Sequence, residues 1–368
     1  MRWPWQRAAA RHDTLVFSLG AGTLDWLLGD TRTQPPTVRR WGSEPLAEDG
    51  ALPDAELLRS LSHSAGTATA VLPLSGYQLL QIEAPAVPPD ELRAAARWHI
   101  RERVDVHVDD LTLDVLRVGR PQAPTVGQGQ LFVIAAPTTR VVQLNATAES
   151  ARWPLQVIDV TDLAQRNLHT AAAGAADLAD RATACLMQHG SSSLITICVG
   201  DELYYSRRLD WDAELLDRAA AARAKSTSAA TDANEPAFAA SGLEGAELGA
   251  SGSFTFSLDD IGLPPAIELG ADTEDAGSRL VVELQRSFDV WERSWPDLPL
   301  GVLWLHHTGD TDATSQYLQE LLGMRVMPLN LQQLYTPATA GDDAASTPLP
   351  EPQVPLLGAL LRHVRLEP

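Results

Sequence analysis

One short segment carries residue types at a spacing that could bind a metal ion. Asp105, His107 and Asp109 alternate with other residues, so in an extended chain their side chains would lie on one face. Carboxylate and imidazole groups are ordinary metal ligands. A solvated strand face explains the same alternation, and we favour that interpretation. His306 and His307 would point to opposite sides of an extended chain, which makes them a poor ligand pair.

Nucleophilic chemistry finds little support elsewhere in the sequence. The run of three serines that begins at Ser191 lacks the bracketing glycines of a nucleophile elbow and has no obvious histidine and acid partners. Lys225 is the only lysine, which excludes a Walker A loop, a Schiff base or a lysine base at any other position. Cys185 and Cys198 are the only thiols, too few for a secreted disulfide framework and not spaced as a zinc site. The sequence therefore predicts no catalytic constellation, and its thiols favour a reducing cytoplasm.

Composition narrows the function classes further. The chain has 368 residues, 45% of them apolar, which is enough for two or three modules with a large core. Its 48 acidic and 28 basic residues give a net charge of -20, which repels the phosphates of nucleic acid and anionic lipid. No stretch approaches the ~18 apolar residues of a membrane span, and the apolar run after residue 13 is too interrupted for a signal peptide. We expect a protein that stays in the cytoplasm and has no nucleic-acid partner.

The central part of the chain predicts a small α+β module. Tyr77 begins an apolar strand over residues 77–82, and prolines at residues 85, 88 and 89 delay any helix until Asp90 and Glu91, which suit a helix N-terminus. Leu92, Ala95, Ala96 and His99 then recur at helical spacing beside Trp98. Alternating valines predict a strand over residues 104–108, and residues 111–118 another. Trp98, Trp291 and Trp304 are most simply interpreted as core residues.

The flanking halves repeat one pattern. The first has strands at residues 14–19, 24–28 and 37–41, a helix from residue 53 and a strand at 67–72, and the second has strands at 182–188, 194–199 and 203–208 followed by a helix at 212–224. Later elements are a strand at 300–305, a helix at 313–322 that stops at Gly323, and a strand at 326–329. Each half opens with two strands joined by a glycine turn. This duplication predicts two related α/β lobes.

These patterns predict the following division of the chain. Residues 12–72 and 152–180 would form the core of a first lobe, residues 73–151 an inserted α+β subdomain, and residues 181–335 a second lobe. Residues 225–253 have almost no large apolar side chains, which predicts a disordered insertion, and residues 336–355 predict a second flexible stretch. A C-terminal helix would cover residues 356–368.

Two related lobes with a module inserted in the first resemble the plan of the actin-like (ribonuclease H-like) superfamily. Five sequence blocks, at residues 72–80, 91–98, 157–160 with 165–168, 203–209 and 282–288, are similar in the same order to the MshI proteins of mannose-sensitive haemagglutinin pilus biogenesis. Those proteins are relatives of the type IV pilus assembly protein PilM. The resemblance implies a cytoplasmic actin-like assembly factor at the inner-membrane platform of a pilus machine.

The resemblance also implies a nucleotide cleft between the lobes, with three turns that the sequence alters. In PilM-like proteins the first turn reads Asp-x-Gly-Ser-x-Ser-x-Lys, whereas here Gly20 and Thr23 persist, Gly22 lies between them, Ser18 replaces the aspartate and Asp25 replaces the lysine. The degenerate first turn therefore lacks the acid that would hold magnesium. An acid about 6 Å from a phosphate would cost about 3 kcal/mol at an effective dielectric of about 20.

The second and third turns are altered too. The second, expected as Asp-x-Gly, ends in Gly190 and Ser191 but carries Gln188 in place of the acid, and only Gly309 survives of the glycine-rich third turn. With both metal-binding carboxylates missing, we expect no ATP hydrolysis, no required cofactor and at most weak binding of ATP and magnesium. Simple turns between secondary-structure elements explain the glycines equally well.

The resemblance implies a protein partner as well. In PilM a short N-terminal cytosolic segment of PilN, a bitopic inner-membrane protein, binds in a groove between the first-lobe core and the inserted module. Tyr77, Leu79 and Leu80 are candidate contacts for such a segment, unless they form the core of the module. The protein would then lie in the cytoplasm, peripheral to the inner membrane through its partner.

The leading hypothesis is a non-catalytic scaffold for pilus assembly. A nucleotide-binding ATPase or sugar-kinase relative is the alternative, and the missing cleft carboxylates discriminate against it. A third possibility is the cytoplasmic part of an L-type protein of type II secretion, although such chains continue into a membrane span and this sequence ends at Pro368 without one.

Overall fold

The first lobe is built on a sheet whose central strands are buried on both faces. The structure, a computed structural model, describes residues 13–20, 22–47, 52–61, 65–119, 129–211, 213–232, 271–338 and 348–364. The strands of the first sheet run in the order β14-β3-β2-β1-β4-β8, and their bounds are β1 Asp13–Leu19, β2 Thr23–Asp30, β3 Thr37–Pro45, β4 Ala65–Leu72, β8 Leu155–Val160 and β14 Thr336–Pro337. β1, β2 and β3 form an antiparallel meander, and β4 and β8 add in parallel to β1.

The second lobe repeats this arrangement. Its sheet has the order β11-β10-β9-β12-β13, with bounds β9 Ala182–His189, β10 Ser192–Val199, β11 Glu202–Leu209, β12 Leu300–His306 and β13 Val326–Pro328. Three strands again form an antiparallel meander, and two add in parallel to the first of them. The predicted duplication of the two halves is confirmed.

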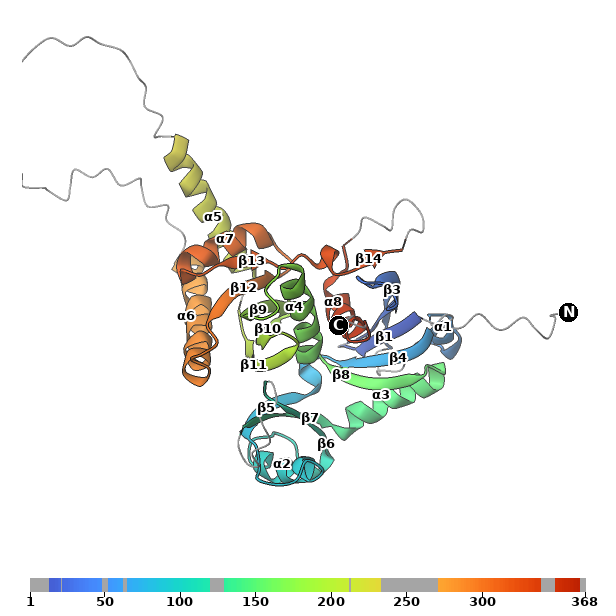
Figure 1. Cartoon of the computed structure of the whole chain (residues 1–368). Helices are drawn as coiled ribbons and strands as arrows, with labels where there is room; N and C mark the ends of the chain where they lie inside the picture. Colours follow the sequence, from blue (N-terminus) through green and yellow to red (C-terminus); the bar gives the residue numbers. More distant parts are fainter. Residues whose placement is uncertain are drawn as a thin grey trace, which may run out of the picture.

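A third, smaller sheet lies to one side of the two larger ones (Figure 1). It is antiparallel, in the order β5-β7-β6, with bounds β5 Gln78–Glu83, β6 Leu111–Arg117 and β7 Gln130–Pro137. α2, over Leu92–Ile100, covers one face of this sheet, and its buried residues Leu92, Ala96 and Ile100 recur at helical spacing. This sheet and helix form the inserted module.

Two predictions within the module are wrong. Residues 104–108 do not form a strand. The two sides of the central strand β7 are already paired with β5 and β6, and residues 104–108 form the connection from α2 to β6. Val108 begins a single 3-10 turn, and the His107 ring accepts a hydrogen bond from the backbone N–H of Asp109 at 3.4 Å. Trp98 is not a core residue, since its side chain is 71% exposed, whereas Trp291 and Trp304 are buried as expected.

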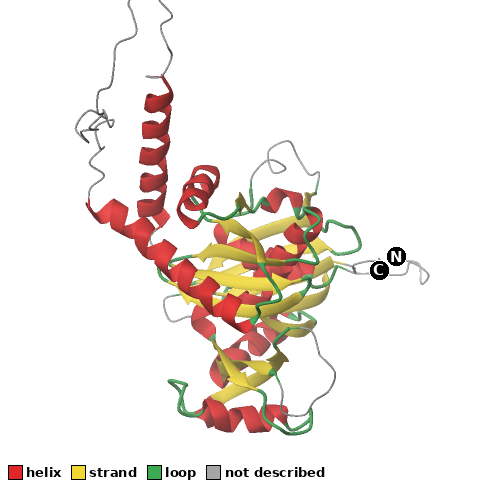
Figure 2. Cartoon of the chain, turned by 60° about the vertical axis from the view of Figure 1, so that its left-hand side comes forward, coloured by secondary structure: helices red, strands yellow, loops and turns green. Residues whose placement is uncertain are grey.

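Helices cover the sheets (Figure 2). Their bounds are α1 Ala55–Leu61, α3 Thr138–Ala151, α4 Thr161–Ala175, α5 Ala213–Asp232, α6 Ala271–Ser294, α7 Thr311–Leu322 and α8 Val354–Leu361. α7 starts at an Asp310 cap and stops at Gly323, whose φ of 65° places it in the left-handed region, as predicted for this helix end. None of the helices in these described ranges is long and apolar enough to cross a membrane.

The predicted flexible stretches need correction at their ends. α5 continues to Asp232 instead of ending before residue 225, because its alanines favour helix strongly. The rest of the predicted insertion, residues 233–253, lies outside the described residues. Residues 336–337 pair with β3, and α8 starts at Val354 with a proline in its first turn, where proline is tolerated. Residues 339–347 and 365–368 also lie outside the described part of the chain.

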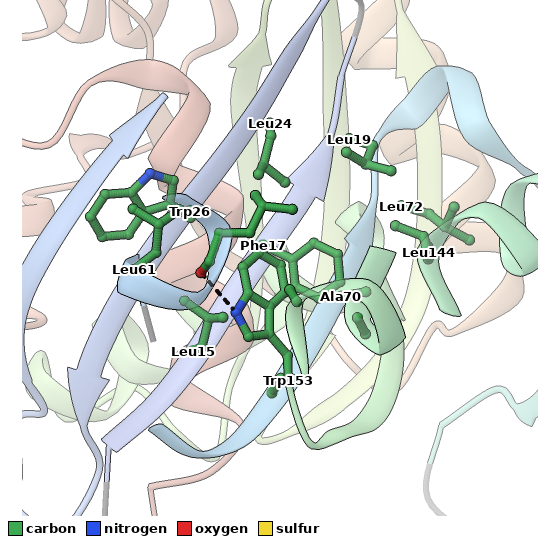
Figure 3. Close-up of a cluster of buried hydrophobic side chains, with 14 of the residues drawn as sticks. Leu15, Phe17, Leu19, Leu24, Trp26, Leu61, Ala70, Leu72, Leu144 and Trp153 are labelled. Atoms are coloured by element: carbon green, nitrogen blue, oxygen red, sulfur yellow. Dashed lines mark hydrogen bonds between the residues drawn. The ribbon is translucent and has the colours of Figure 1, made fainter. Parts of the chain in front are cut away.

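The first-lobe core is shown in Figure 3. Phe17 and Trp153 pack with ring centroids 4.9 Å apart, and the Trp153 indole N–H donates to the backbone oxygen of Leu58 at 3.2 Å. Leu144, Ala148 and Ala151 of α3 belong to the same core. Although α3 falls within residues 73–151, which we expected to form the inserted subdomain, its apolar face therefore packs in the first lobe.

The C-terminal helix α8 returns to the first lobe and packs on β1, β2, β4 and α4. Its contact with α4 is close, since a Cβ at Gly358 would lie 2.2 Å from the backbone oxygen of Ala164. The cluster around α8 also contains Cys185 and Trp304 of the second lobe. α8 and α4 therefore form part of the junction between the two lobes (Figure 1).

Candidate functional site

The turn between β1 and β2 is held by its own backbone. The Gly20 N–H donates to the Thr23 carbonyl at 2.9 Å, and the Gly22 carbonyl accepts from the Leu46 N–H at 2.8 Å. Gly22 has a φ of 89°, which favours glycine whatever the turn binds. Gly22 is thus explained by the local structure of the turn.

Asp25, which stands in place of the expected lysine, lies directly beside this turn. Its two carboxylate oxygens accept hydrogen bonds from the hydroxyls of Thr23 at 3.1 Å and Ser43 at 2.5 Å. A Cβ at Gly20 would lie 3.6 Å from one of these oxygens. Ser18 pairs with Asp25 across the β1–β2 ladder and brings a hydroxyl where an acid was expected. The first turn therefore carries a negative charge at its side and lacks the metal-binding acid.

The turn between β9 and β10 is also occupied by protein groups. Gly190 has a φ of 62°, and its carbonyl accepts from the Gln188 amide at 3.1 Å. The Gly190 N–H donates to the carboxylate of Glu351, which precedes α8, while Ser191 is exposed. Gln188 also accepts from the backbone N–H and hydroxyl of Thr308, both at 3.4 Å. The second turn thus already binds an anion, and that anion is part of the same chain.

The third turn, after β12, lies against α5. A Cβ at Gly309 would lie 1.6 Å from a carboxylate oxygen of Asp217, so this side chain fills the space beside the glycine. The other oxygen of Asp217 accepts from the Thr314 hydroxyl at 2.8 Å. Asp310 accepts from the Ala313 N–H at 3.0 Å and caps α7. Gly309 is therefore explained by its close approach to Asp217.

A carboxylate lies at each of the three turns: Asp25 at the first, Glu351 at the second and Asp217 at the third. Burial lowers the pKa of His189 to about 3 and that of His306 to about 4, so these rings are neutral at pH 7 and add no positive charge. Any of these carboxylates that lay about 6 Å from a bound phosphate would repel it by about 3 kcal/mol at a dielectric of about 20. This set of groups fits a magnesium nucleotide poorly.

Tyr77, a candidate partner contact, lies instead at the junction of the module with both lobes. Its side chain is 3% exposed, and its hydroxyl donates to the Asp162 carboxylate at the start of α4. Asp162 also accepts from the Ser206 hydroxyl, and Arg208 of β11 donates to the Tyr77 carbonyl at 2.9 Å. Burial and the adjacent Asp162 raise the pKa of Tyr77 well above its usual value, which keeps the hydroxyl protonated. In this conformation Tyr77 is a core residue and offers no surface to a peptide.

Leu79 and Leu80 are half-buried on opposite faces of β5. Leu79 packs against the cores of both lobes, and Leu80 packs against the core of the module below α2. Because β5 lies at the edge of its sheet, its outer backbone groups have no strand partner in the described structure. Of the three predicted contacts, only Leu79 and Leu80 keep part of their side chains accessible.

A cavity of about 70 Å³ lies in the first lobe, beside the start of the chain segment that leads from β4 into the module. Its lining comes from the ends of β1 and β4, the 3-10 turn Leu74–Gly76 and α3, and includes Leu19, Gly20, Leu72, Arg140 and Gln143. Its walls do not include Tyr77, Leu79 or Leu80, and none of them comes from the module's sheet or from α2.

The candidate metal ligands are not brought together. Asp105 accepts a hydrogen bond from the Gln78 amide at 2.6 Å, and the nearest approach of His107 to the Asp109 carboxylate is 3.7 Å. Within the described ranges, no group of three or more histidines, cysteines and acids is arranged to hold a metal ion.

Glu351 and Asp217 were missed by sequence reasoning, although both contact the turns that it singled out. Glu351 is 161 positions from Gly190, and it lies in a stretch that composition alone suggests is flexible. Asp217 lies in the second turn of α5, whose first-turn acid is Glu214. Nothing local distinguishes it from the other acids of that helix.

No protein-family model and no curated protein matches the sequence. Among solved structures, the PilM–PilN type IV pilus biogenesis complex is similar with a TM-score of 0.60 and 19% identity, covering 97% of this chain and 100% of that chain. The cytoplasmic domain of EpsL, an inner-membrane component of the type II secretion system of Vibrio cholerae, has a TM-score of 0.37 and 16% identity, covering 57% of this chain and 75% of that chain. A Bacteroides thetaiotaomicron protein with an actin-like ATPase fold has a TM-score of 0.43 and 7% identity, covering 86% and 91%.

At 19% identity, the similarity to the PilM–PilN structure is evidence for the fold alone. The two lobes of this chain share one arrangement of strands, and a module is inserted between β4 and β8. The similarity to the PilM–PilN structure extends over 97% of the chain and so includes both lobes and the module. The chain has the actin-like fold.

Proposed function

We propose that this protein is an actin-like scaffold for type IV pilus biogenesis, of the MshI type found in mannose-sensitive haemagglutinin pilus systems. The observation that carries the proposal is the similarity over 97% of the chain to a structure of the PilM–PilN complex. The five sequence blocks similar to MshI proteins support the narrower assignment.

We also propose that the scaffold is non-catalytic and needs neither ATP nor magnesium. The support is the presence of Asp25, Glu351 and Asp217 at the three cleft turns, together with Ser18 and Gln188 in place of metal-binding acids. Phosphoryl transfer depends on positive charge placed around the transferred group, and these turns supply negative charge instead.

The proposed partner is the cytosolic N-terminal segment of a PilN-like bitopic inner-membrane protein. With a net charge of -20, the protein cannot bind an anionic membrane surface by charge alone. A membrane protein that presents a cytosolic segment would place it in the cytoplasm at the inner membrane, and PilN is the partner named in the similar structure.

The cavity beside Gly20 is the proposed docking site. Leu19, Leu72 and Leu144 give it an apolar wall, and Arg140 stands at its exposed side. A short extended segment could place one apolar side chain in a space of about 70 Å³ and meet polar groups at the entrance. We expect Leu79 and Leu80 of the module to contribute less to binding than the residues that line the cavity.

Two substitutions on neighbouring positions of α3 test this site. Gln143 lines the cavity, whereas Val142 is 58% exposed and does not line it. Gln143→Trp should fill the cavity, and Val142→Trp adds the same indole outside it. Purified variants would be mixed with a synthetic peptide of the cytosolic N-terminus of the PilN-like protein from the same pilus gene cluster, and binding measured by fluorescence anisotropy.

We expect Gln143→Trp to weaken peptide binding at least tenfold and Val142→Trp to change it less than twofold. Equal binding by both variants would exclude this cavity as the docking site. Failure of the unmodified protein to bind the peptide at all would count against the pilus partner itself.

A further inference from the structure

The segment before α8 contacts both lobes. We call residues 348–353 the strap. Leu349 is 8% exposed, and at the other end Gln353 is 1% exposed. The strap is therefore anchored on both sides of Glu351, which holds the Glu351 side chain in one place.

Hydrogen bonds connect the strap to the first turn of the cleft. The Gln353 amide donates to the Ser43 hydroxyl at 3.0 Å and to the Gly42 carbonyl at 3.1 Å. Ser43 in turn donates to Asp25, which also accepts from Thr23 at the end of the turn. One end of the strap is thus continuous with the polar groups beside Gly20.

Glu351 connects the same strap to the second turn, through the bond that its carboxylate accepts from the Gly190 N–H. An unbroken path of hydrogen bonds and short backbone therefore runs from Thr23 in the first lobe to Gly190 in the second. In a nucleotide-binding relative the phosphates would bridge these two turns. Here the chain supplies a bridging anion itself.

We propose that the strap is a built-in latch, in which the carboxylate of Glu351 replaces a bound phosphate and holds the second turn to the first lobe. This inference rests on the proposed non-catalytic function, because it gives the second turn a permanent anion partner where a nucleotide-binding relative would place a phosphate. Closure of the cleft becomes a fixed property of the fold instead of a response to ATP.

Tethering makes such an anion hard to displace. A free phosphate must lose translational and rotational freedom to reach the Gly190 amide, whereas Glu351 is already positioned by Leu349 and Gln353. α8 reinforces the anchor, because Leu356, Leu357 and Leu360 are fully buried directly after the strap. Release of the strap would therefore begin at Glu351, its half-buried middle, and not at its ends.

Hydrogen exchange at the Gly190 amide tests the latch. The variant is Glu351→Ala in the full chain, and the control is Glu149→Ala, which removes an exposed carboxylate from α3, away from the strap. Exchange would be followed by NMR at the Gly190 amide, with amides of β1 as the measure of global stability.

We expect Glu351→Ala to raise the Gly190 exchange rate about tenfold and Glu149→Ala to leave it unchanged, with β1 unaffected in both. An increase of less than threefold in Glu351→Ala, or an equal increase in the control, would overturn the latch. An increase that extends equally to β1 would also overturn it, since Glu351 would then act on the whole fold. An ATPase assay of the unmodified protein tests the proposed non-catalytic function separately.

Discussion

Removal of one hydroxyl, by the substitution Tyr77→Phe, should destabilise the protein although Tyr77 lies far from any chemistry. The Tyr77 hydroxyl donates a hydrogen bond to the Asp162 carboxylate. The same hydroxyl accepts a hydrogen bond from the backbone N–H of Asp162 at 3.2 Å. In Tyr77→Phe the buried carboxylate keeps only the Ser206 hydroxyl as a side-chain donor among the bonds described here. The ring, with the Arg208 guanidinium 5.2 Å from its centroid, keeps its packing.

The expected loss follows from the charge of the acceptor. A hydrogen bond to a charged group contributes about 1.5 to 3 kcal/mol, and the change opens almost no cavity, so we expect a loss of about 2 kcal/mol in the free energy of unfolding. The assay is urea denaturation followed by circular dichroism. Tyr205→Phe is the matched control, because Tyr205 is half-buried on the same strand as Ser206, and it should cost less than about 0.5 kcal/mol.

A Tyr77→Phe protein as stable as the control would refute the junction as described. That result would favour a role of the Tyr77 side chain in partner binding over a role in stability. Truncation to alanine should cost more, about 3 to 5 kcal/mol, because the whole ring is buried.

Three further outcomes are expected. Gly358→Ala should destabilise the protein by several kcal/mol, because the new Cβ would lie 2.2 Å from the Ala164 oxygen. The new Cβ of Gly174→Ala in α4 would meet nothing within 4 Å, so this substitution should stabilise the protein by up to about 1 kcal/mol. Thermal unfolding measures both changes. Burial lowers the pKa of His169 to about 3, so the unfolded chain binds a proton between about pH 6.5 and pH 3 that the folded chain does not, and stability should fall as pH falls through this window. At pH 5 the His169 contribution is about 1 to 2 kcal/mol, so His169→Gln should show a smaller drop between pH 7 and pH 5; an equal drop would contradict the assignment. Trp98→Ala should leave the thermal midpoint within about 1 °C, and a large decrease would show that the indole packs in a core.

The lobes could be predicted because their patterns are local. Apolar runs such as residues 14–19 and 300–305 become central strands, and Gly323 ends α7 with the positive φ that the sequence signal implies. The repeat of strand, glycine turn, strand and strand also gives the topology, because each meander is closed by short turns.

Predictions failed where the outcome depends on contacts between distant parts of the chain. Trp98 was assigned to the core because tryptophans are mostly buried, but it lies two residues from Ala96, about 200° around the helix, and so faces away from the buried stripe. Residues 104–108 have the alternation of a strand and no neighbouring strand to pair with.

The cleft illustrates the same limit. The altered turns could be recognised in the sequence, because Ser18, Asp25 and Gln188 stand at positions of a known motif. What fills them could not, since Glu351 is 161 positions from Gly190 in the sequence and contacts it only in the folded chain.

Isothermal titration of the full-length protein with magnesium-ATP tests the central claim, that the cleft of this actin-like scaffold is held by its own chain and not by nucleotide. We predict no heat of binding up to millimolar ATP, which corresponds to a binding free energy weaker than about -4 kcal/mol. A micromolar or tighter dissociation constant, about -8 kcal/mol or better, would contradict the account, because the nucleotide would then have to displace Glu351 and tolerate Asp25 and Asp217.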